Sequence, residues 1–165
     1  MSVDLPISLS PRDMHREAID DVNRWRGHCT DLFARIDAAV AETLEVLAET
    51  GAPVKTPHLF GQRMPAMRDA LASDLPFAVK SGPILKMFDA LGPHLARRNI
   101  IIHATGSVWI NPGGAWLWRY CVTPSGKNRS QEQGSIDRCE ALAIEKELAP
   151  MCRSFCDQLS NLRRR

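Results

Sequence analysis

The sequence lacks the features that mark a membrane, secreted or zinc-binding protein. Its first twenty residues contain no continuous apolar run and hold several charged residues and prolines, so neither a secretory signal nor a membrane span is predicted. The five cysteines include no C-x-x-C pair, which argues against a disulfide framework and against a zinc ribbon. We therefore expect a cytoplasmic protein with no membrane association and no metal site.

An excess of charge of one sign is also missing, because the formal net charge is only +2. The arginines are nevertheless clustered: Arg97 and Arg98 are adjacent, and Arg163, Arg164 and Arg165 occupy the last three positions. Clustered guanidinium groups suit phosphate, whose oxygens match their fork of donors. Arg97 and the three last arginines are therefore candidate nucleic-acid-binding residues, although a frayed, solvated tail is the favoured alternative for the last three.

Length and composition predict one folded domain. The chain has 165 residues, of which 44% are hydrophobic and 24% are charged. These are the proportions of an ordinary globular protein, and a chain of this length normally forms a single core. We expect residues 1–165 to form a single helical domain.

The first fifty residues predict one long helix. Ser10 can cap it, Pro11 suits its first position, and apolar residues then recur in steps of three and four up to Gly51. Two nearly collinear helices divided near Gly27 are the alternative.

Shorter helices are expected in the middle of the chain, where prolines and glycines mark starts and stops. Residues 58–73 predict one helix whose early part can be loop. Residues 81–92 predict a second helix, and residues 93–104 predict a third that begins at Pro93. His94 would then be a surface residue in the first turn of that third helix.

After residue 103 the hydrophobic period changes from that of a helix to that of strands. Residues 107–122 alternate apolar and polar side chains around the turn sequence NPGG, which predicts a β-hairpin with strands near 107–111 and 115–122. Three of the four tryptophans lie in this hairpin. They can cover one end of the helical core, which is the favoured interpretation, or they can form a stacking platform for bases.

The last part of the chain predicts a polar loop at residues 126–134 and an amphipathic helix at residues 135–162, which Pro150 should kink or divide. The expected fold class is therefore mainly α. It is a helical bundle with a long N-terminal helix and a β-hairpin, at about residues 107–122, inserted before the C-terminal helix.

One stretch, ARRNIIIHATGSVW at residues 96–109, combines burial with a polar edge. Its three consecutive isoleucines indicate a buried helix face. If residues 93–104 are helical, Asn99 and His103 lie one turn apart on one face, and Arg98 lies about 140° from His103 around the axis. A fixed cation, an amide and an imidazole, which is the side chain that titrates near neutrality, would gather at this edge.

The segment RNIIIH resembles the signature of the HEPN superfamily of helical-bundle proteins. That signature is an arginine, a polar residue that is commonly Asn, Asp or His, and a histidine four to six residues after the arginine. Arg98, Asn99 and His103 match it, with four residues between Arg98 and His103. The long first helix, the shorter middle helices and the closing helix are also similar to the family over most of the chain.

The resemblance implies a homodimer that cleaves single-stranded RNA without a metal ion or another cofactor. Two copies of the motif would form a composite active site, where the ribose 2′-hydroxyl attacks the phosphate and leaves a 2′,3′-cyclic phosphate. His103 would be the general acid or base, Arg98 would stabilise charge on the phosphate, and Asn99 would orient His103 or the phosphate. DNA should not be cut. The role would be that of a toxin or defence effector, with an antitoxin or another regulatory partner.

Other functions fit the same sequence. A non-catalytic module could keep the bundle and bind RNA or a protein partner through its basic tail and tryptophan hairpin. An antitoxin-like helical partner could use the long first helix as a dimer seam. For His103 alone, the alternative is a structural role at a helix end, where an imidazolium interacts well with the helix dipole. Asp31 and Asp37 could reach the motif from the long helix, although solvated charges are the commoner case.

Overall fold

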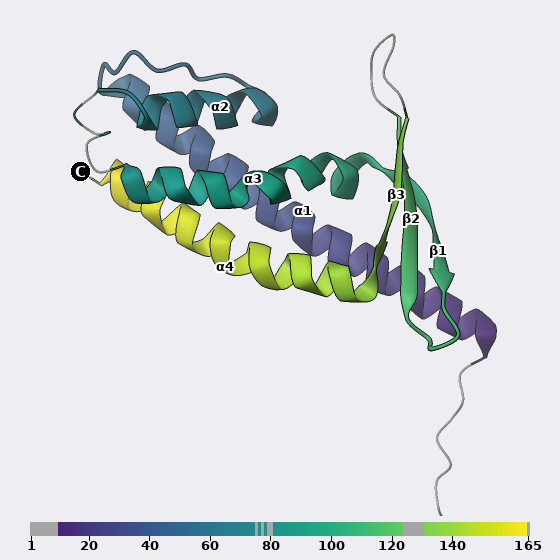
Figure 1. Cartoon of the computed structure of the whole chain (residues 1–165). Coiled ribbons are helices and arrows are strands. Elements are labelled where there is room, and N and C mark those ends of the chain that lie inside the picture. The colour runs from purple at the N-terminus through teal and green to yellow at the C-terminus, as the bar shows by residue number, and fades with distance from the viewer. Residues whose placement is uncertain (1–9, 75, 77, 79–80, 124–130, 165) are drawn as a thin grey trace, which may run out of the picture.

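The structure is a computed structural model that describes residues 10–74, 76, 78, 81–123 and 131–164. Within these residues the chain forms four helices and one sheet (Figure 1). The helices are α1 (Pro11–Glu49), α2 (Phe60–Leu71), α3 (Gly82–His103) and α4 (Arg138–Arg163), and the strands are β1 (Thr105–Ile110), β2 (Trp116–Val122) and β3 (Glu132–Asp137). The expected mainly helical fold with a long first helix is confirmed. None of the described helices is both long enough and apolar enough to span a membrane.

The first helix is unbroken. Ser10 caps it, since its hydroxyl oxygen accepts a hydrogen bond from the backbone N–H of Asp13 at 3.2 Å, and Pro11 occupies the first turn. The helix passes Gly27 without a break and ends just before Gly51, which has a positive φ of 83°. The one-helix alternative is therefore the correct one.

The prediction of two helices over residues 81–104 is wrong, because α3 runs without interruption through Gly92 and Pro93. A proline inside a helix removes one N–H donor and normally breaks the helix. Here the residues on either side belong to the core: Leu91 is 0% exposed and His94 is 4% exposed. Burial of this face outweighs the local preference, and it makes His94 a core residue rather than the expected surface one.

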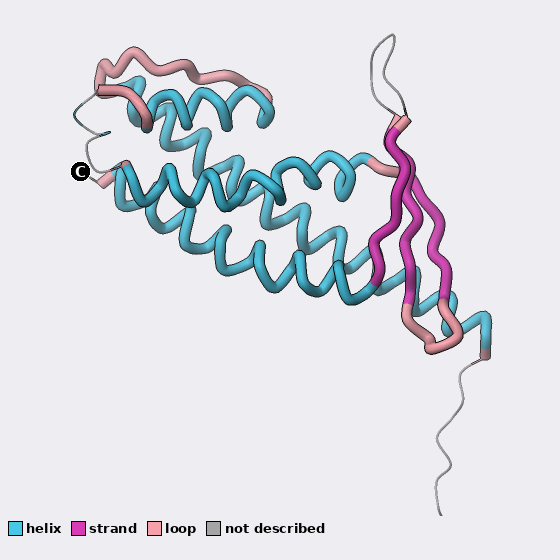
Figure 2. Tube along the Cα trace, in the orientation of Figure 1, coloured by secondary structure: helices cyan, strands magenta, loops and turns pink. Residues whose placement is uncertain are grey.

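The three long helices pack side by side, and the sheet stands at one end of them (Figures 1 and 2). Helices α1 and α4 run parallel, because Leu32 contacts Cys152 and, further along both helices, Thr43 contacts Arg163. Helix α3 runs in the opposite direction and packs against both, while α2 lies at the end away from the sheet (Figure 1). The hydrophobic core fills the space between the helices and the inner face of the sheet.

The sheet has the strand order β1-β2-β3 and is antiparallel throughout. Its inner face packs on the helices, since Trp116 is 5% exposed and Trp118, which pairs with Val108 and Ile136, is 2% exposed. These two tryptophans cover the end of the helical core, as the favoured interpretation expects. Trp109 points to the opposite face, in keeping with the alternation of a strand, and is 56% exposed.

The third strand corrects the expectation of a two-stranded hairpin followed by a polar loop and a helix from residue 135. Strand β3 buries only Ile136, which is 4% exposed, so its sequence shows almost no apolar alternation. Gly134 lies against Tyr120, which any side chain at that position would meet, and this contact explains a glycine in mid-strand. The part of the expected loop up to residue 130 lies outside the described residues.

Helix α4 begins three residues later than expected. The carboxylate of Asp137 caps it by accepting a hydrogen bond from the backbone N–H of Glu140 at 2.8 Å. The helix then continues through Pro150, so the predicted division does not occur. Leu142 on this helix is exposed, with 55% of its surface accessible.

The burial of His94 predicts that stability is sensitive to acid. Burial lowers the pKa of His94 from its usual 6.5, the Glu147 carboxylate raises this pKa in part, and Arg97 lowers it further. Below about pH 6.5, His94 therefore binds a proton in the unfolded chain more readily than in the folded chain. The stabilising contribution is complete above that pH and is lost as the pH falls through the lowered pKa.

Urea unfolding at pH 7.5 and pH 5.5 measures this effect. The wild type should lose up to about 1.4 kcal/mol of stability per pH unit from this one histidine. His94→Leu should flatten the slope, whereas His15→Leu, at an exposed position, should leave it unchanged. Equal slopes in the wild type and in His94→Leu would contradict the assignment.

Candidate functional site

The predicted motif lies in the last turns of α3. Asn99 and His103 are exposed there and Arg98 is half-buried. The intervening isoleucines point the other way, since Ile100 is 9% exposed and Ile101 is 1% exposed. The expected combination of a buried helix face and a polar edge is therefore present.

Arg98 is held in place without being neutralised. Its Cζ lies 4.1 Å from the centre of the Phe60 ring on α2, and its Nη1 donates a weak hydrogen bond to Asn99 Oδ1 at 3.4 Å. Its Nε is buried and makes no hydrogen bond. Within the part of the chain that the structure describes, no carboxylate forms an ion pair with Arg98. The guanidinium therefore keeps its charge and several donors for an anion.

Arg97, the neighbouring residue, is in a different situation. Its Nη2 lies 3.6 Å from Glu140 Oε1 at the start of α4, and both side chains are 43% exposed. Burial raises the pKa of the nearby Tyr120, and the charges of Glu132 and Glu140 raise it further while Arg97 lowers it. Arg97 thus belongs to a partly exposed, partly neutralised cluster, where it can contact phosphate only by leaving Glu140.

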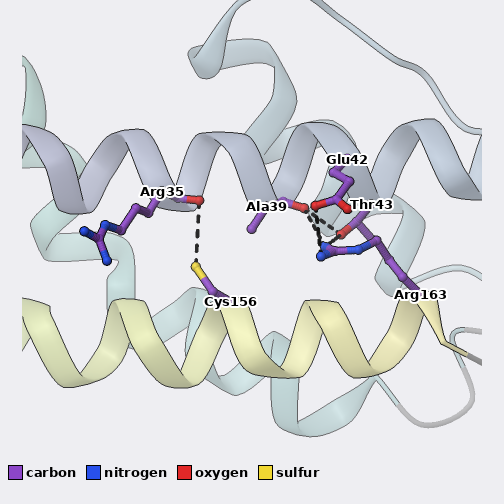
Figure 3. A network of polar contacts seen from close by, with 6 residues as sticks. All are labelled: Arg35, Ala39, Glu42, Thr43, Cys156 and Arg163. Atoms are coloured by element: carbon purple, nitrogen blue, oxygen red, sulfur yellow. Dashed lines mark hydrogen bonds and ion pairs between the residues drawn. The ribbon is translucent and has the colours of Figure 1, made fainter.

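The arginines at the end of the chain do not join the motif. Arg163 reaches across to α1, where its Nη1 donates to Thr43 Oγ1 at 2.9 Å and to the Ala39 carbonyl at 3.3 Å, and its Nη2 pairs with Glu42 at 2.9 Å (Figure 3). Its side chain is 16% exposed, so this arginine fastens α4 to α1 instead of fraying into solvent.

Arg164 is exposed, and Arg165 lies outside the described residues. Helix α4 separates Glu140, the partner of Arg97, from Arg163 by roughly 35 Å at its rise of about 1.5 Å per residue. Arg163 and Arg164 therefore lie at the opposite end of the bundle from Arg97.

An arginine that sequence reasoning misses controls the end of the motif helix. Arg26 of α1 donates from Nε to the Ile101 carbonyl at 2.8 Å, and from Nη2 to the Ala104 carbonyl at 3.0 Å and to the Ile102 carbonyl at 3.4 Å. Its Cζ also lies 4.6 Å from the centre of the Trp118 ring. These carbonyls at the end of α3 would otherwise lack partners. Nothing in the local sequence around Arg26 indicates this role, because the partners are distant in the chain.

A polar hollow adjoins the end of α3. Strand β1 begins two residues after His103, and the solvent face of the sheet next to it has a hollow of about 570 Å³. Ser107, Arg119 and Ser135 are cross-strand neighbours in this hollow. Arg119 is exposed and, among the residues described, forms no ion pair. Hydroxyl groups and a free guanidinium suit a phosphate backbone.

The acidic residues of the long helix do not reach the motif. Asp31 pairs with Arg35 at 2.8 Å along α1, and Asp37 pairs with Arg63 of α2 at 2.8 Å. In residues 10–74, 76, 78, 81–123 and 131–164, no group of three or more His, Cys, Asp or Glu side chains is placed to hold a metal ion.

No family model, no curated protein and no solved structure matches this chain. The chemistry of the described residues therefore carries the functional proposal. That chemistry is an unneutralised guanidinium, an amide and an imidazole at one helix end, next to a polar hollow.

The contacts of Arg26 predict a large loss of stability when its guanidinium is removed. Arg26→Met keeps much of the apolar stem but leaves carbonyls at the end of α3 unpaired, at a cost of about 2 to 4 kcal/mol. Urea unfolding should show this loss, and hydrogen exchange should show early opening at the end of α3.

Arg24→Met is the matched control, because Arg24 lies two residues away with its side chain 77% exposed and, within the described part of the chain, pairs with Asp21 alone. It should change the free energy of unfolding by less than about 1 kcal/mol. Similar losses in both variants would show that the Arg26 contacts do not stabilise the end of α3.

Proposed function

We propose that this protein is a HEPN-like endoribonuclease that cleaves single-stranded RNA without a metal ion and acts as a homodimer. The observation that supports it best is the state of Arg98, which is fixed on Phe60 yet unneutralised by any described carboxylate. Asn99 and His103 are exposed on the same helix end, where a substrate has access to them.

The reaction proposed for this site is transfer of the phosphoryl group within the RNA. A general base removes the proton of the ribose 2′-hydroxyl, the 2′-oxygen forms a bond to phosphorus, and the bond from phosphorus to the 5′-oxygen breaks. A general acid returns a proton to that leaving oxygen. The products are a 2′,3′-cyclic phosphate and a 5′-hydroxyl. His103 is the proposed proton-transfer group, and Arg98 stabilises the charge on the phosphate oxygens.

The helix geometry favours a composite site. Arg98 and His103 are separated by about 140° around the axis of α3, so one copy does not direct both side chains at the same phosphate. Two copies related by a two-fold axis can place His103 of one chain beside Arg98 of the other. DNA lacks the 2′-hydroxyl and should resist cleavage. A cytoplasmic toxin or defence effector restrained by an antitoxin or another regulatory partner is the biological role proposed.

A non-catalytic RNA-binding module is the second candidate, and the sheet favours it. Its solvent face combines the free Arg119 with hydroxyl groups, and the exposed Trp109 lies on the same face, its Nε1 donating to Ser107 Oγ at 3.0 Å. One exposed indole beside a cation is enough to stack a single base. In this alternative His103 has no catalytic task.

Loss of the imidazole separates the two candidates. His103→Ala should reduce cleavage of labelled single-stranded RNA in EDTA by at least about a hundredfold, because general acid-base catalysis contributes that much. Products with cyclic phosphate ends, and an uncut DNA strand of the same sequence, complete the assignment.

His15→Ala is the control, since it removes another exposed histidine that is distant in sequence from the motif. Arg98→Lys keeps the charge but loses the fork of donors and should also cut poorly. Absence of cleavage by the wild type on transfer RNA and total cellular RNA, with RNA binding equal in wild type and His103→Ala, would replace the enzyme with the binding module.

A further inference from the structure

A second cleft lies between α1 and α4, away from the motif helix. It has a volume of about 340 Å³, which is within the range of sites for small ligands. Its walls are one face of α1, one face of α4 and the first residue of β2, and it contains no residue of α3. The lining residues include Trp25, His28, Trp116, Arg138, Leu142 and Glu145.

One wall carries an oriented imidazole. His28 Nδ1 lies 2.7 Å from Glu145 Oε1, and this contact joins α1 to α4 across the cleft. The carboxylate fixes the ring with a proton on Nδ1, and in the doubly protonated ring Nε2–H is a second donor that can meet a ligand. The His28 side chain is 45% exposed, so a ligand in the cleft has access to it.

The rim carries a cation that nothing described neutralises. Arg138 is exposed at the first position of α4, and among residues 10–74, 76, 78, 81–123 and 131–164 it forms no ion pair. Arg24, on the opposite helix, is paired with Asp21 at 2.9 Å. The N-terminal end of α4 is already capped by the Asp137 carboxylate, so Arg138 is the group at this end that can meet an anion. An anion at this rim would therefore meet a free guanidinium.

The floor of the cleft is apolar. Trp25 and Trp116 line it and are each 5% exposed, and their indole nitrogens are closed to solvent. Leu142 lines the cleft with 55% of its surface exposed, which leaves an apolar wall open to a ligand. An exposed leucine in a cleft with a charged rim suits a ligand that has both an anionic and an apolar part.

We propose that this cleft binds a small organic phosphate with a flat, apolar body, of mononucleotide size. The phosphate would lie between Arg138, which provides a fork of donors, and the doubly protonated His28 ring, whose Nε2–H would donate to the phosphate while Nδ1–H donates to Glu145. The flat body would pack on Leu142 and against the two indoles that line the floor. This site is separate from the end of α3 and does not depend on the proposed ribonuclease function.

Isothermal titration calorimetry of the full chain with adenosine 5′-monophosphate tests the site. Adenosine and inorganic phosphate, titrated separately, measure how much the flat part and the phosphate of the ligand each contribute to binding. We expect one adenosine 5′-monophosphate per chain and binding at least tenfold weaker for each of the two parts. Arg138→Glu and His28→Ala should each weaken binding of the nucleotide tenfold or more, the loss expected for one charge-assisted contact.

Two variants are matched controls. Arg153→Ala removes another exposed arginine of α4 that does not line the cleft, and Arg98→Ala disables the end of α3. Both should bind the nucleotide as the wild type does, and circular dichroism and thermal midpoints should confirm that every variant is folded.

Several outcomes would overturn the proposal. They are no binding of adenosine 5′-monophosphate by the wild type, unchanged binding in folded Arg138→Glu, and binding lost in Arg98→Ala but kept in Arg138→Glu. Inorganic phosphate that binds as tightly as the nucleotide would refute an organic ligand. A change in oligomeric state in Arg138→Glu would assign the cleft to contacts between copies of the chain. Because the measurement uses no RNA cleavage, failure here is distinguishable from failure of the ribonuclease proposal.

Discussion

The contact between Arg26 and the end of α3 organises the half of the molecule that carries the candidate site. The last carbonyls of a helix have no partners within it, and inside a fold each must find a donor. Arg26 satisfies the carbonyls of Ile101 and Ala104 and rests on the ring of Trp118. One side chain thus joins α1, α3 and β2. The chain can therefore turn from α3 directly into β1 without leaving buried carbonyls unpaired.

The same end of α3 shows how packing separates arginines that are neighbours in the sequence. Arg98 stacks on Phe60 and is not neutralised by a described carboxylate, whereas Arg97 forms an ion pair with Glu140. A cation held by an aromatic ring is fixed without being neutralised, which is the condition for binding phosphate. Arg163 illustrates the opposite case, since its charge is used to fasten α4 to α1. The position of each arginine in the fold therefore decides whether its guanidinium is available to bind phosphate.

The sequence predicts the elements whose local signals and tertiary contacts agree. Helix α1 has a cap, a first-turn proline and a long apolar stripe, and all three indicate the same structure. The break expected at Pro93 fails because the core contacts of Leu91 and His94 outweigh a local preference. Strand β3 has almost no apolar pattern, so its side chains do not predict a strand. It forms because its backbone pairs with β2. Roles such as that of Arg26 depend on partners some 75 residues away, which no local pattern contains.

The two proposed sites differ in the number of chains that each requires, and measurements at different protein concentrations can therefore distinguish them. The motif on α3 places Arg98 and His103 about 140° apart on one helix, and the chemistry proposed for it therefore uses a second copy of the chain. The cleft between α1 and α4 brings Arg138 and His28 together within one copy. Cleavage of RNA per chain should therefore fall as the protein is diluted below the dissociation constant of the dimer. The affinity for adenosine 5′-monophosphate should stay constant over the same dilution, because each monomer carries a complete cleft.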